Sequence, residues 1–246
     1  MKWIKLDATP STNAYLKKLL EEVPFFEEVA VTTKRQTQGR GQRGTTWQSE
    51  GGKNLTMSYL HLPNSLEASR QFELNMGVAL GVLDVLEAYG LPELSVKWPN
   101  DILSSAYKVG GILIENQLKG RFLNSAIVGL GLNVHQEEFT DLPQARSLIH
   151  CAPGPYHLEK MSKAFVEAWK RRLEPLSLRP RSPLLKEEYE SRLFGKDQWN
   201  DFREPKSEVF QAQVQGVEES GKLRLELKSG EQRLYDLKEV EMIYSS

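Results

Sequence analysis

The sequence KVGGILIENQLKGRFLNSAIVGLGLNV, residues 108–134, decides the fold. It holds two long stretches rich in Ile, Leu and Val, Val109–Gln117 and Arg121–Val134, with Lys119-Gly120 between them. Apolar, β-branched runs that flank a glycine-containing turn are typical of paired strands. The segment therefore predicts a long β-hairpin in the middle of the chain.

Both strands of this hairpin contain glycines among their apolar residues, namely Gly110, Gly111, Gly129 and Gly131. Glycine inside a strand often marks a place where a ligand or another backbone comes close. The hairpin is therefore expected to form a slot for a flat or slender ligand. Lys108 before the first strand and Asn133 near the end of the second are candidate polar contacts, although a surface lysine at a strand start is the alternative for Lys108.

Apolar periodicity on both sides of the hairpin predicts further strands and helices. Strands are expected at Trp3–Asp7, Val29–Thr33, Asn54–Leu62 and Leu94–Trp98. Helices are expected from Ser11 onward, from Leu66 to Tyr89 with Asn64 as N-cap and Gly90 as stop, from Leu158 to Leu173, and from Pro183 to a stop at Gly195. This mixture predicts an α/β domain over residues 1–195.

The sequence pattern changes after Asp197, where short apolar runs alternate with Gly- and Ser-containing turns. Strands are expected at Val209–Val217, Leu223–Leu227, Arg233–Leu237 and Val240–Tyr244. This alternation of short strands and turns predicts a small all-β barrel over residues 196–246, appended to the first domain.

Composition limits the class of protein. Of 246 residues, 39% are hydrophobic and 26% are charged, which excludes a disordered chain, a collagen or a coiled-coil rod. The net charge of −1 lacks the basic excess typical of nucleic-acid binding. Cys151 alone cannot form an internal disulfide, no apolar run approaches the ~20 residues that span a bilayer, and the charged Met1–Asp7 segment is no signal peptide. A soluble, cytoplasmic protein without membrane contact is expected.

The loop Gly39-Arg40-Gly41-Gln42-Arg43-Gly44 formally matches the dinucleotide motif G-x-G-x-x-G. That motif needs a strand directly before it and a helix directly after it, whereas Lys34–Gln38 and Thr45–Gly52 provide neither. Glycines let a backbone approach an anion closely, and arginines bind phosphate or carboxylate with charge-assisted hydrogen bonds. We therefore interpret residues 34–53 as a mobile basic cover over an anionic ligand, with a solvated loop as the alternative.

A second polar string, Lys97-Trp98-Pro99-Asn100-Asp101, follows a predicted strand. Ligands often bind where strands of open sheets end, although an Asn-Asp turn is the simpler interpretation. His150, Cys151 and His157 do not have the spacing of a zinc site, and no P-loop or G-x-S-x-G motif is present.

Taken together, these strings resemble the biotin protein ligase family. The similar segments occur in the order and spacing of the family over residues 11–133: Ser11-Thr12-Asn13, Gln36 with Gly39–Trp47, Lys97–Asp101, Lys108–Glu115 and Gly129–Asn133. The β-rich end also resembles the SH3-like C-terminal module of that family. The resemblance implies an α+β fold, a mixed sheet flanked by helices, with a small SH3-like β-barrel after the catalytic domain.

The resemblance also implies a two-step reaction with MgATP, in which the magnesium ligands are unknown. The biotin carboxylate attacks the α-phosphorus of ATP to give biotinyl-5′-AMP and pyrophosphate. A lysine amine of a biotin carboxyl carrier domain then displaces AMP. Because the Ser-Thr-Asn string begins at residue 11, no N-terminal DNA-binding domain and no specific DNA binding are expected.

Residue roles follow from the same resemblance and from side-chain chemistry. The candidate catalytic residues are Lys108 and Arg40, for the carboxylate and α-phosphate, and Asp101, for the incoming amine. The candidate biotin-binding residues are Ser11, Thr12, Asn13, Gln36, Arg40, Gly41, Gln42, Lys108, Gly111, Gly129 and Gly131. The candidate adenylate-binding residues are Arg40, Arg43, Trp47, Lys97, Asn100, Lys108 and Asn133.

The chain departs from the family pattern at two positions, and two alternative functions remain open. The family commonly has arginine where this chain has Gln42 and Thr45, which bears on how firmly the loop holds the adenylate. A lipoate or octanoate ligase or transferase shares the fold but uses a different arginine-glycine signature and lacks Lys-Trp-Pro-Asn-Asp. A biotin-binding module without chemistry would be expected to lack Lys108 or Arg40, and both are present.

Overall fold

The computed structural model describes residues 1–22, 27–140, 142–205 and 207–244, and the side chain of Arg43 lies outside that description. Within these residues the strands form a seven-stranded sheet of order β1-β2-β3-β7-β6-β5-β4 and a five-stranded sheet of order β11-β10-β9-β8-β12. The strands of the first sheet are β1 (Lys2–Thr9), β2 (Val29–Gln36), β3 (Leu55–His61), β4 (Leu94–Lys97), β5 (Asp101–Ser104), β6 (Tyr107–Lys119) and β7 (Phe122–Leu132). The helices are α1 (Thr12–Glu22), α2 (Gln71–Ala88), α3 (Leu148–Cys151), α4 (Leu158–Leu178) and α5 (Pro183–Ser191).

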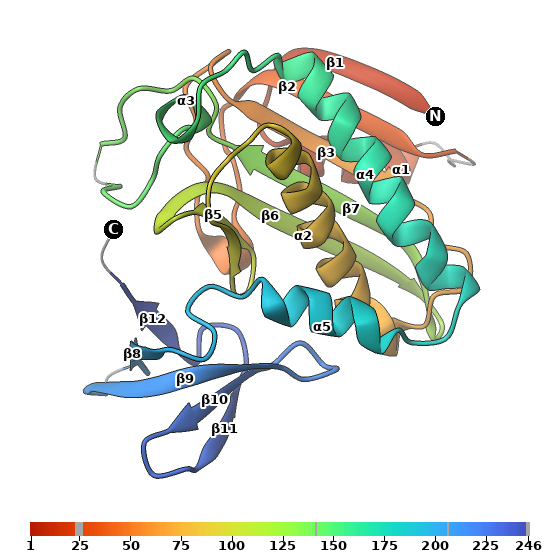
Figure 1. Cartoon of the computed structure of the whole chain (residues 1–246). Coiled ribbons are helices and arrows are strands. Elements are labelled where there is room, and N and C mark those ends of the chain that lie inside the picture. The colour runs from red at the N-terminus through yellow and green to blue at the C-terminus, as the bar shows by residue number, and fades with distance from the viewer. Residues whose placement is uncertain (23–26, 141, 206, 245–246) are drawn as a thin grey trace.

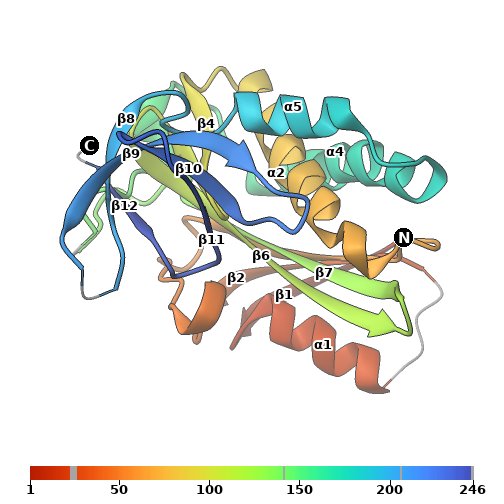
Figure 2. The same ribbon diagram turned by 90° about the horizontal axis from the view of Figure 1, so that it is seen from below.

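Helices cover both faces of the seven-stranded sheet (Figures 1 and 2), with α1 on one face and α2 and α4 on the other. Strand alternation places a small apolar cluster under α1, which includes Leu16, Val31, Leu60 and Ile127. The intervening strand residues join a much larger cluster under α2 and α4. All pairs in this sheet are antiparallel except β1 with β2, so the sheet is mixed as predicted.

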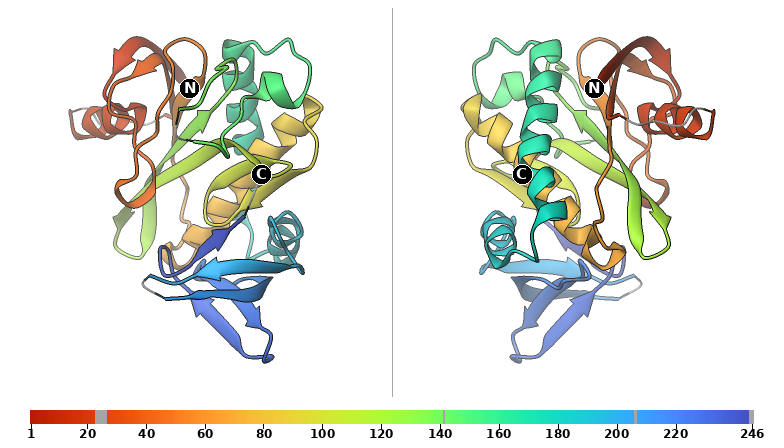
Figure 3. Two further views of the ribbon diagram at one scale, coloured as in Figure 1. Left: turned by 90° about the vertical axis from the view of Figure 1, so that its left-hand side faces the viewer. Right: turned by 90° about the vertical axis from the view of Figure 1, so that its right-hand side faces the viewer.

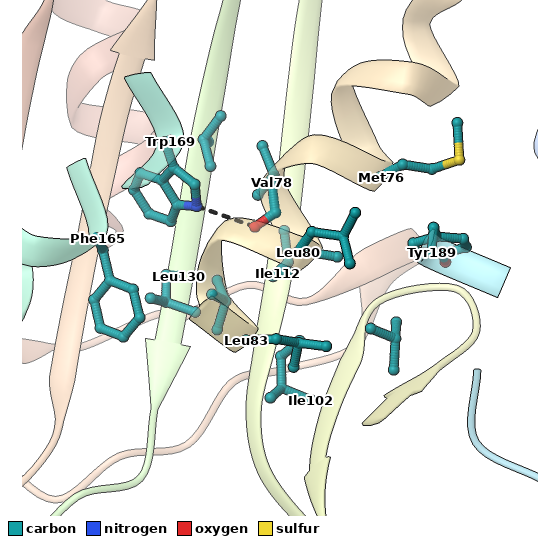
Figure 4. Packing of buried hydrophobic residues seen from close by; sticks show 14 of the residues in the cluster. Met76, Val78, Leu80, Leu83, Ile102, Ile112, Leu130, Phe165, Trp169 and Tyr189 are labelled. Carbon is teal, nitrogen blue, oxygen red and sulfur yellow. Dashed lines mark hydrogen bonds between the residues drawn. The ribbon is translucent and has the colours of Figure 1, made fainter. Parts of the chain in front are cut away.

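The larger cluster includes Trp169 of α4 (Figure 4), which is fully buried. Its indole Nε1 donates a 3.1 Å hydrogen bond to the carbonyl of Val78 in α2, and its ring stacks with those of Tyr59 and Phe165. A Cβ on Gly81 of α2 would lie only 2.9 Å from this indole, so the two helices pack closely. Helix α2 is apolar nearly all round because the sheet and α4 bury it from both sides.

The second sheet comprises β8 (Trp199–Arg203), β9 (Val209–Val217), β10 (Leu223–Leu227), β11 (Gln232–Tyr235) and β12 (Glu241–Ile243). It lies at one end of the molecule beside α5 (Figure 3). In the described residues β11 and β12 are its two edges and do not pair, so the expected small β domain is present as an antiparallel sheet that is not closed into a barrel. The indole of Trp98 donates a 2.9 Å hydrogen bond to the carbonyl of Gly221 and thereby joins the two sheets.

Several sequence expectations change in the structure. Helix α2 begins at Gln71 rather than at Leu66, because Leu66 and Ala68 form backbone hydrogen bonds with Leu123 and Arg121 at the start of β7. Strands β5 and β8 and the short helix α3 were not predicted, since each is at most five residues long and carries little periodicity. The hairpin turn at Gly120, the start of α5 at Pro183 and the bounds of β9 and β10 are confirmed.

None of the helices in the described ranges is long and apolar enough to cross a membrane.

The packing around Trp169 predicts its contribution to stability. Trp169→Ala removes a fully buried ring and its hydrogen bond, so the free energy of unfolding should fall by about 3–5 kcal/mol. Trp199→Ala is the matched control, because Trp199 is 46% exposed and its loss should cost less than about 1 kcal/mol. Chemical denaturation measures both values, and equal losses for the two variants would contradict this account of the core.

Candidate functional site

A cavity of about 510 Å³ lies on the α1 face of the seven-stranded sheet and extends to the second sheet. It is a suitable size for a small molecule or a cofactor. It brings together most of the predicted site residues, namely Ser11, Thr12, Asn13, Gln36, Arg40, Gly41, Gln42, Trp47, Lys97, Asn100, Asp101, Lys108, Gly111, Gly129 and Gly131.

The register of the sheet forms the floor of this cavity. Lys97 pairs with Asp101, Asp101 with Gly111, Gly111 with Gly131, and Gly131 with Thr56, so these residues form one row across five strands. Residues directly opposite one another in paired strands point to the same face. The row therefore places a cation and a carboxylate beside two positions that have no side chain.

A β-bulge turns Lys108 toward this row. The register of β5 and β6 shifts between Ile102 and Leu103, whereas uninterrupted alternation from Gly111 would place Lys108 on the opposite, core face. The Lys108 ammonium instead lies 2.6 Å from a carboxylate oxygen of Asp101. The bulge thus converts a lysine on the core face into a cation at the floor of the cavity.

The space above the two glycines holds the indole of Trp47. A Cβ on Gly131 would lie 2.3 Å from this ring, and one on Gly111 would lie 3.3 Å from it. The Lys108 ammonium lies 5.9 Å from the ring centroid, within the range of a cation–π interaction. Trp47 Nε1 is buried without a hydrogen-bond partner, so the loop presents an unsatisfied donor at the site. The glycines therefore accommodate the loop as well as any ligand.

The structure adds detail on three predicted residues. A Cβ on Gly129 would lie 2.4 Å from Asn13 Oδ1, so this glycine, which lines the cavity, also makes room for Asn13. Gly110 belongs to the opposite face, where a Cβ would meet Leu132, so its predicted place in the slot is wrong. Asn133 is absent from the residues that line the cavity. The predicted role of Arg43 concerns a side chain outside the described part of the structure.

Helix α1 begins at one end of the cavity, the α1 end, where polar side chains gather. Gln36 at the end of β2 accepts a 2.8 Å hydrogen bond from the backbone N–H of Thr12 through its Oε1. Ser58 of β3 lies beneath, with its hydroxyl 2.7 Å from that of Thr12 and 2.6 Å from Asn13 Oδ1. The sequence analysis missed Ser58, although its place in an alternating strand opposite the apolar face is a usable signal.

Lys97 lies where the two sheets meet. Burial lowers its pKa and the charge of Lys108 lowers it further, against the opposing effect of Asp101. Its ammonium lies 5.3 Å from the ring centroid of Tyr244, whose backbone carbonyl accepts a 2.6 Å hydrogen bond from the amide of Gln144. Burial and the charge of Asp101 raise the pKa of Tyr244 to about 12.

The second sheet also lines the cavity, through residues that include Glu204, Glu241 and Met242. The sequence analysis assigned no site residue after Asn133. Local pattern does not indicate which face of one sheet meets another, so this contribution could not be predicted.

In the part of the chain that the structure describes, no three His, Cys, Asp or Glu residues cluster as they would around a metal ion. Asn100 and Asp101 nevertheless offer oxygen atoms at the cavity wall, since the Asn100 amide nitrogen is engaged by the carbonyl of Ile112 at 2.8 Å.

Comparison with known proteins agrees with this geometry. The sequence model of the Biotin/lipoate A/B protein ligase family matches residues 6–133, more than half of the chain. The biotin--[acetyl-CoA-carboxylase] ligase of Mycobacterium tuberculosis is 28% identical over 196 residues, which cover 77% of this chain and 71% of that protein. The corresponding Paracoccus denitrificans ligase is 35% identical over 132 residues, or 52% and 53% of the two chains.

Some relatives are longer. The bifunctional ligase/repressor BirA of Bacillus subtilis is 35% identical over 141 residues, which cover 57% of this chain but only 42% of BirA. In fold, biotin protein ligase from Aquifex aeolicus in complex with biotin and ATP is similar over 99% of both chains, with a TM-score of 0.76 and 24% identity. With the match over residues 6–133, these findings show that the chain belongs to the biotin/lipoate A/B protein ligase family.

Proposed function

We propose that this chain is an ATP-dependent ligase that activates biotin as biotinyl-5′-AMP and transfers it to a lysine of a biotin carboxyl carrier domain. The observation that carries the proposal is the row of Lys97, Asp101, Gly111 and Gly131, with Lys108 turned onto it by the bulge. The names of the Paracoccus denitrificans and Mycobacterium tuberculosis relatives support this assignment. So does a similar Leishmania major structure, which was determined with biotinyl-5-AMP.

For the first step we assign biotin to the length of the cavity. The neutral ureido ring would meet the hydroxyl and amide groups of Ser11, Thr12 and Gln36, which line the α1 end. The biotin carboxylate then reaches Lys108 and Arg40, where it attacks the α-phosphorus of ATP and pyrophosphate leaves. Fixed cations at this point stabilise the charge that develops on the phosphate oxygens.

Magnesium would enter with the nucleotide. Mg²⁺ binds through one or two protein carboxylates together with substrate phosphates, and it neutralises phosphate charge. The oxygen atoms of Asp101 and Asn100 are suitable for holding it at the cavity wall. The loop with Trp47 and the cation Lys97 would meet the adenylate side of the intermediate.

In the second step a carrier lysine attacks the acyl-adenylate, its nitrogen bonds to the acyl carbon, and AMP leaves. A free lysine has a pKa of ~10.4 and is almost entirely protonated near neutral pH. Asp101 is the proposed group that orients the amine or receives its proton. Because Asp101 also contacts Lys108 at 2.6 Å, this role would follow the transfer of Lys108 to the phosphate.

The alternative within the family is a lipoate or octanoate ligase or transferase. The polar groups at the α1 end favour biotin, because a dithiolane or alkyl chain offers no partner for them. Arg40 and Lys108 at the reacting end favour an enzyme over a binding module without chemistry. We further propose a cytoplasmic location. We also propose that the protein lacks sequence-specific DNA binding, in keeping with its net charge of −1.

The decisive test mixes the purified protein with MgATP and either biotin or lipoate, and measures pyrophosphate release. Release with biotin, followed by biotinylation of an added carrier domain, is the expected result. Release with lipoate alone would assign the rival activity, and biotin binding without release would indicate a binding module.

Lys108→Ala should separate binding from chemistry. The charge of Lys108 matters most as phosphate charge develops, so the rate of adenylate formation should fall about 10²–10³-fold, a larger loss than the loss of biotin affinity. Lys119→Ala, at the exposed hairpin turn, is the matched control and should leave both unchanged. Single-turnover kinetics and calorimetry give the two quantities. Weaker biotin binding with an unchanged rate at saturation would contradict the assignment.

The lowered pKa of Lys97 predicts that ATP affinity depends on pH. Because burial lowers its pKa, Lys97 loses its charge at lower pH than an exposed lysine does, and the attraction for ATP declines as pH rises. ATP affinity of the wild type should therefore begin to fall at a lower pH than the ordinary pKa of an exposed lysine, ~10.4, would require. Lys97→Arg, which stays charged, should retain its affinity as the pH rises. Calorimetry measures both curves, with Lys119→Arg as control, and parallel curves for wild type and Lys97→Arg would exclude this role.

A further inference from the structure

Both main-chain hydrogen-bonding groups of Lys108 are held by a short segment that follows β7 in the chain, residues 144–146, here named the strap. The Lys108 N–H donates a 2.7 Å hydrogen bond to the carbonyl of Gln144, and the Lys108 carbonyl accepts a 3.0 Å hydrogen bond from the N–H of Arg146. Ala145, between these two residues, forms a parallel bridge with Lys108. The strap thus occupies the position beside β6 that β7 leaves where it ends.

The side chain of Arg146 fixes the strap further. Its guanidinium carbon lies 3.4 Å from the centroid of the Tyr107 ring, within the range of a cation–π interaction. Tyr107 directly precedes Lys108 in β6, so two consecutive residues of that strand hold the strap. The Gln144 side chain therefore begins at a fixed point beside the cation of the site.

The Gln144 side chain joins the strap to the second sheet. Its Nε2 donates a 2.6 Å hydrogen bond to the backbone carbonyl of Tyr244, which follows β12. A carbonyl only accepts hydrogen bonds, so the nitrogen of the amide must face it. The Tyr244 ring lies 5.3 Å from the Lys97 ammonium and edge-on to the ring of Phe194, with 5.2 Å between the ring centroids. Gln144 thus holds the residue that packs against Lys97.

The position of Gln144 limits how it can act on a ligand. Lys97 and Lys108 line the cavity, whereas Gln144 and Tyr244 are not among the described residues that line it. An effect of the Gln144 side chain on a ligand must therefore pass through Tyr244 and Lys97. A ring beside the Lys97 ammonium reduces its hydration, and a less hydrated cation attracts a phosphate more strongly.

We propose that Gln144 is a positioning residue for ATP, which holds Tyr244 against Lys97 from a strap fixed on Lys108. This inference rests on the proposed function and extends it to a residue beyond the range 6–133 that the family model matches. Without the Gln144 amide the Tyr244 carbonyl loses its partner, the ring leaves Lys97, and water enters around the ammonium. The hydrogen bonds between the strap and Lys108 do not use the Gln144 side chain and remain.

The test is Gln144→Met in the full chain, which keeps the length of the side chain and removes its donor. The KM for ATP in adenylate formation should rise about three- to tenfold, the range of one neutral hydrogen bond. The rate at saturating ATP and the affinity for biotin should each change less than about twofold, because Lys108 keeps its place. Single-turnover kinetics and calorimetry give these quantities.

Gln213→Met is the matched control. Gln213 is also half-buried, its amide donates to the backbone carbonyl of Asp197 at 3.4 Å, and it is not among the described residues that line the cavity. The KM for ATP, the rate at saturation and the biotin affinity should all keep their wild-type values.

A second variant tests the route by which Gln144 acts. Tyr244→Leu removes the ring but keeps the carbonyl, and should raise the KM for ATP to a similar extent as Gln144→Met. Because Gln144 acts through Tyr244, the double variant should have a KM no higher than that of the more affected single variant. Two substitutions that merely loosen the structure would have additive effects instead.

The outcomes separate the two proposals. If the wild type releases no pyrophosphate with biotin and MgATP, the proposed function fails. If the wild type does so, three results would each overturn the positioning role of Gln144 while the ligase activity stands. These are a wild-type KM for ATP in Gln144→Met, additive effects in the double variant, and a loss of biotin affinity that matches the loss of ATP affinity.

Discussion

The pairing of Gly111 with Gly131 is the constraint on which the rest of the site depends. It leaves two adjacent strands without side chains on the α1 face, so the Trp47 ring packs directly over the sheet backbone. The same register brings Asp101 and Lys97 into line with the glycines from the other side. A one-residue slip would move all of these groups to the core face, because the side-chain period of a strand is two. The packed cluster around Trp169 on that opposite face opposes such a slip.

The cavity over Gly111 and Gly131 is lined by neutral polar groups at one end and by charged groups at the other. The α1 end offers neutral hydroxyl and amide groups, whereas the other end carries Lys108, Lys97 and Asp101. A substrate with a neutral polar ring at one end and a carboxylate at the other matches this arrangement, as the proposed function requires. The second sheet meets the charged end, where Tyr244 after β12 contacts Lys97 and Trp98 after β4 donates to Gly221, so the charged groups lie at an interface that partly excludes water. Reduced solvation strengthens electrostatic interactions with a developing phosphate charge.

Much of this could be predicted from sequence. The apolar runs around Gly120 predicted the hairpin, the glycines predicted its notched face, and the polar strings predicted which residues gather at the cavity. The side on which a residue points was harder to predict. Lys108 reaches the site only through a bulge, and Gly110 faces the core although it neighbours Gly111. Ser58 carries no motif, and its place beneath the α1 end of the cavity depends on contacts with residues 45 and 46 positions away in sequence. The open second sheet and its contribution to the cavity depend on packing between distant segments, which local periodicity does not encode.

The most direct test of the central claim is a crystal structure of this protein with a non-hydrolysable analogue of biotinyl-5′-AMP. The account predicts that the acyl-phosphate linkage lies over Gly111 and Gly131, with the phosphate in contact with Lys108 and Arg40 and the ureido ring against Thr12. An adenylate whose phosphate contacts neither cation, or whose ring lies away from the α1 end, would contradict it.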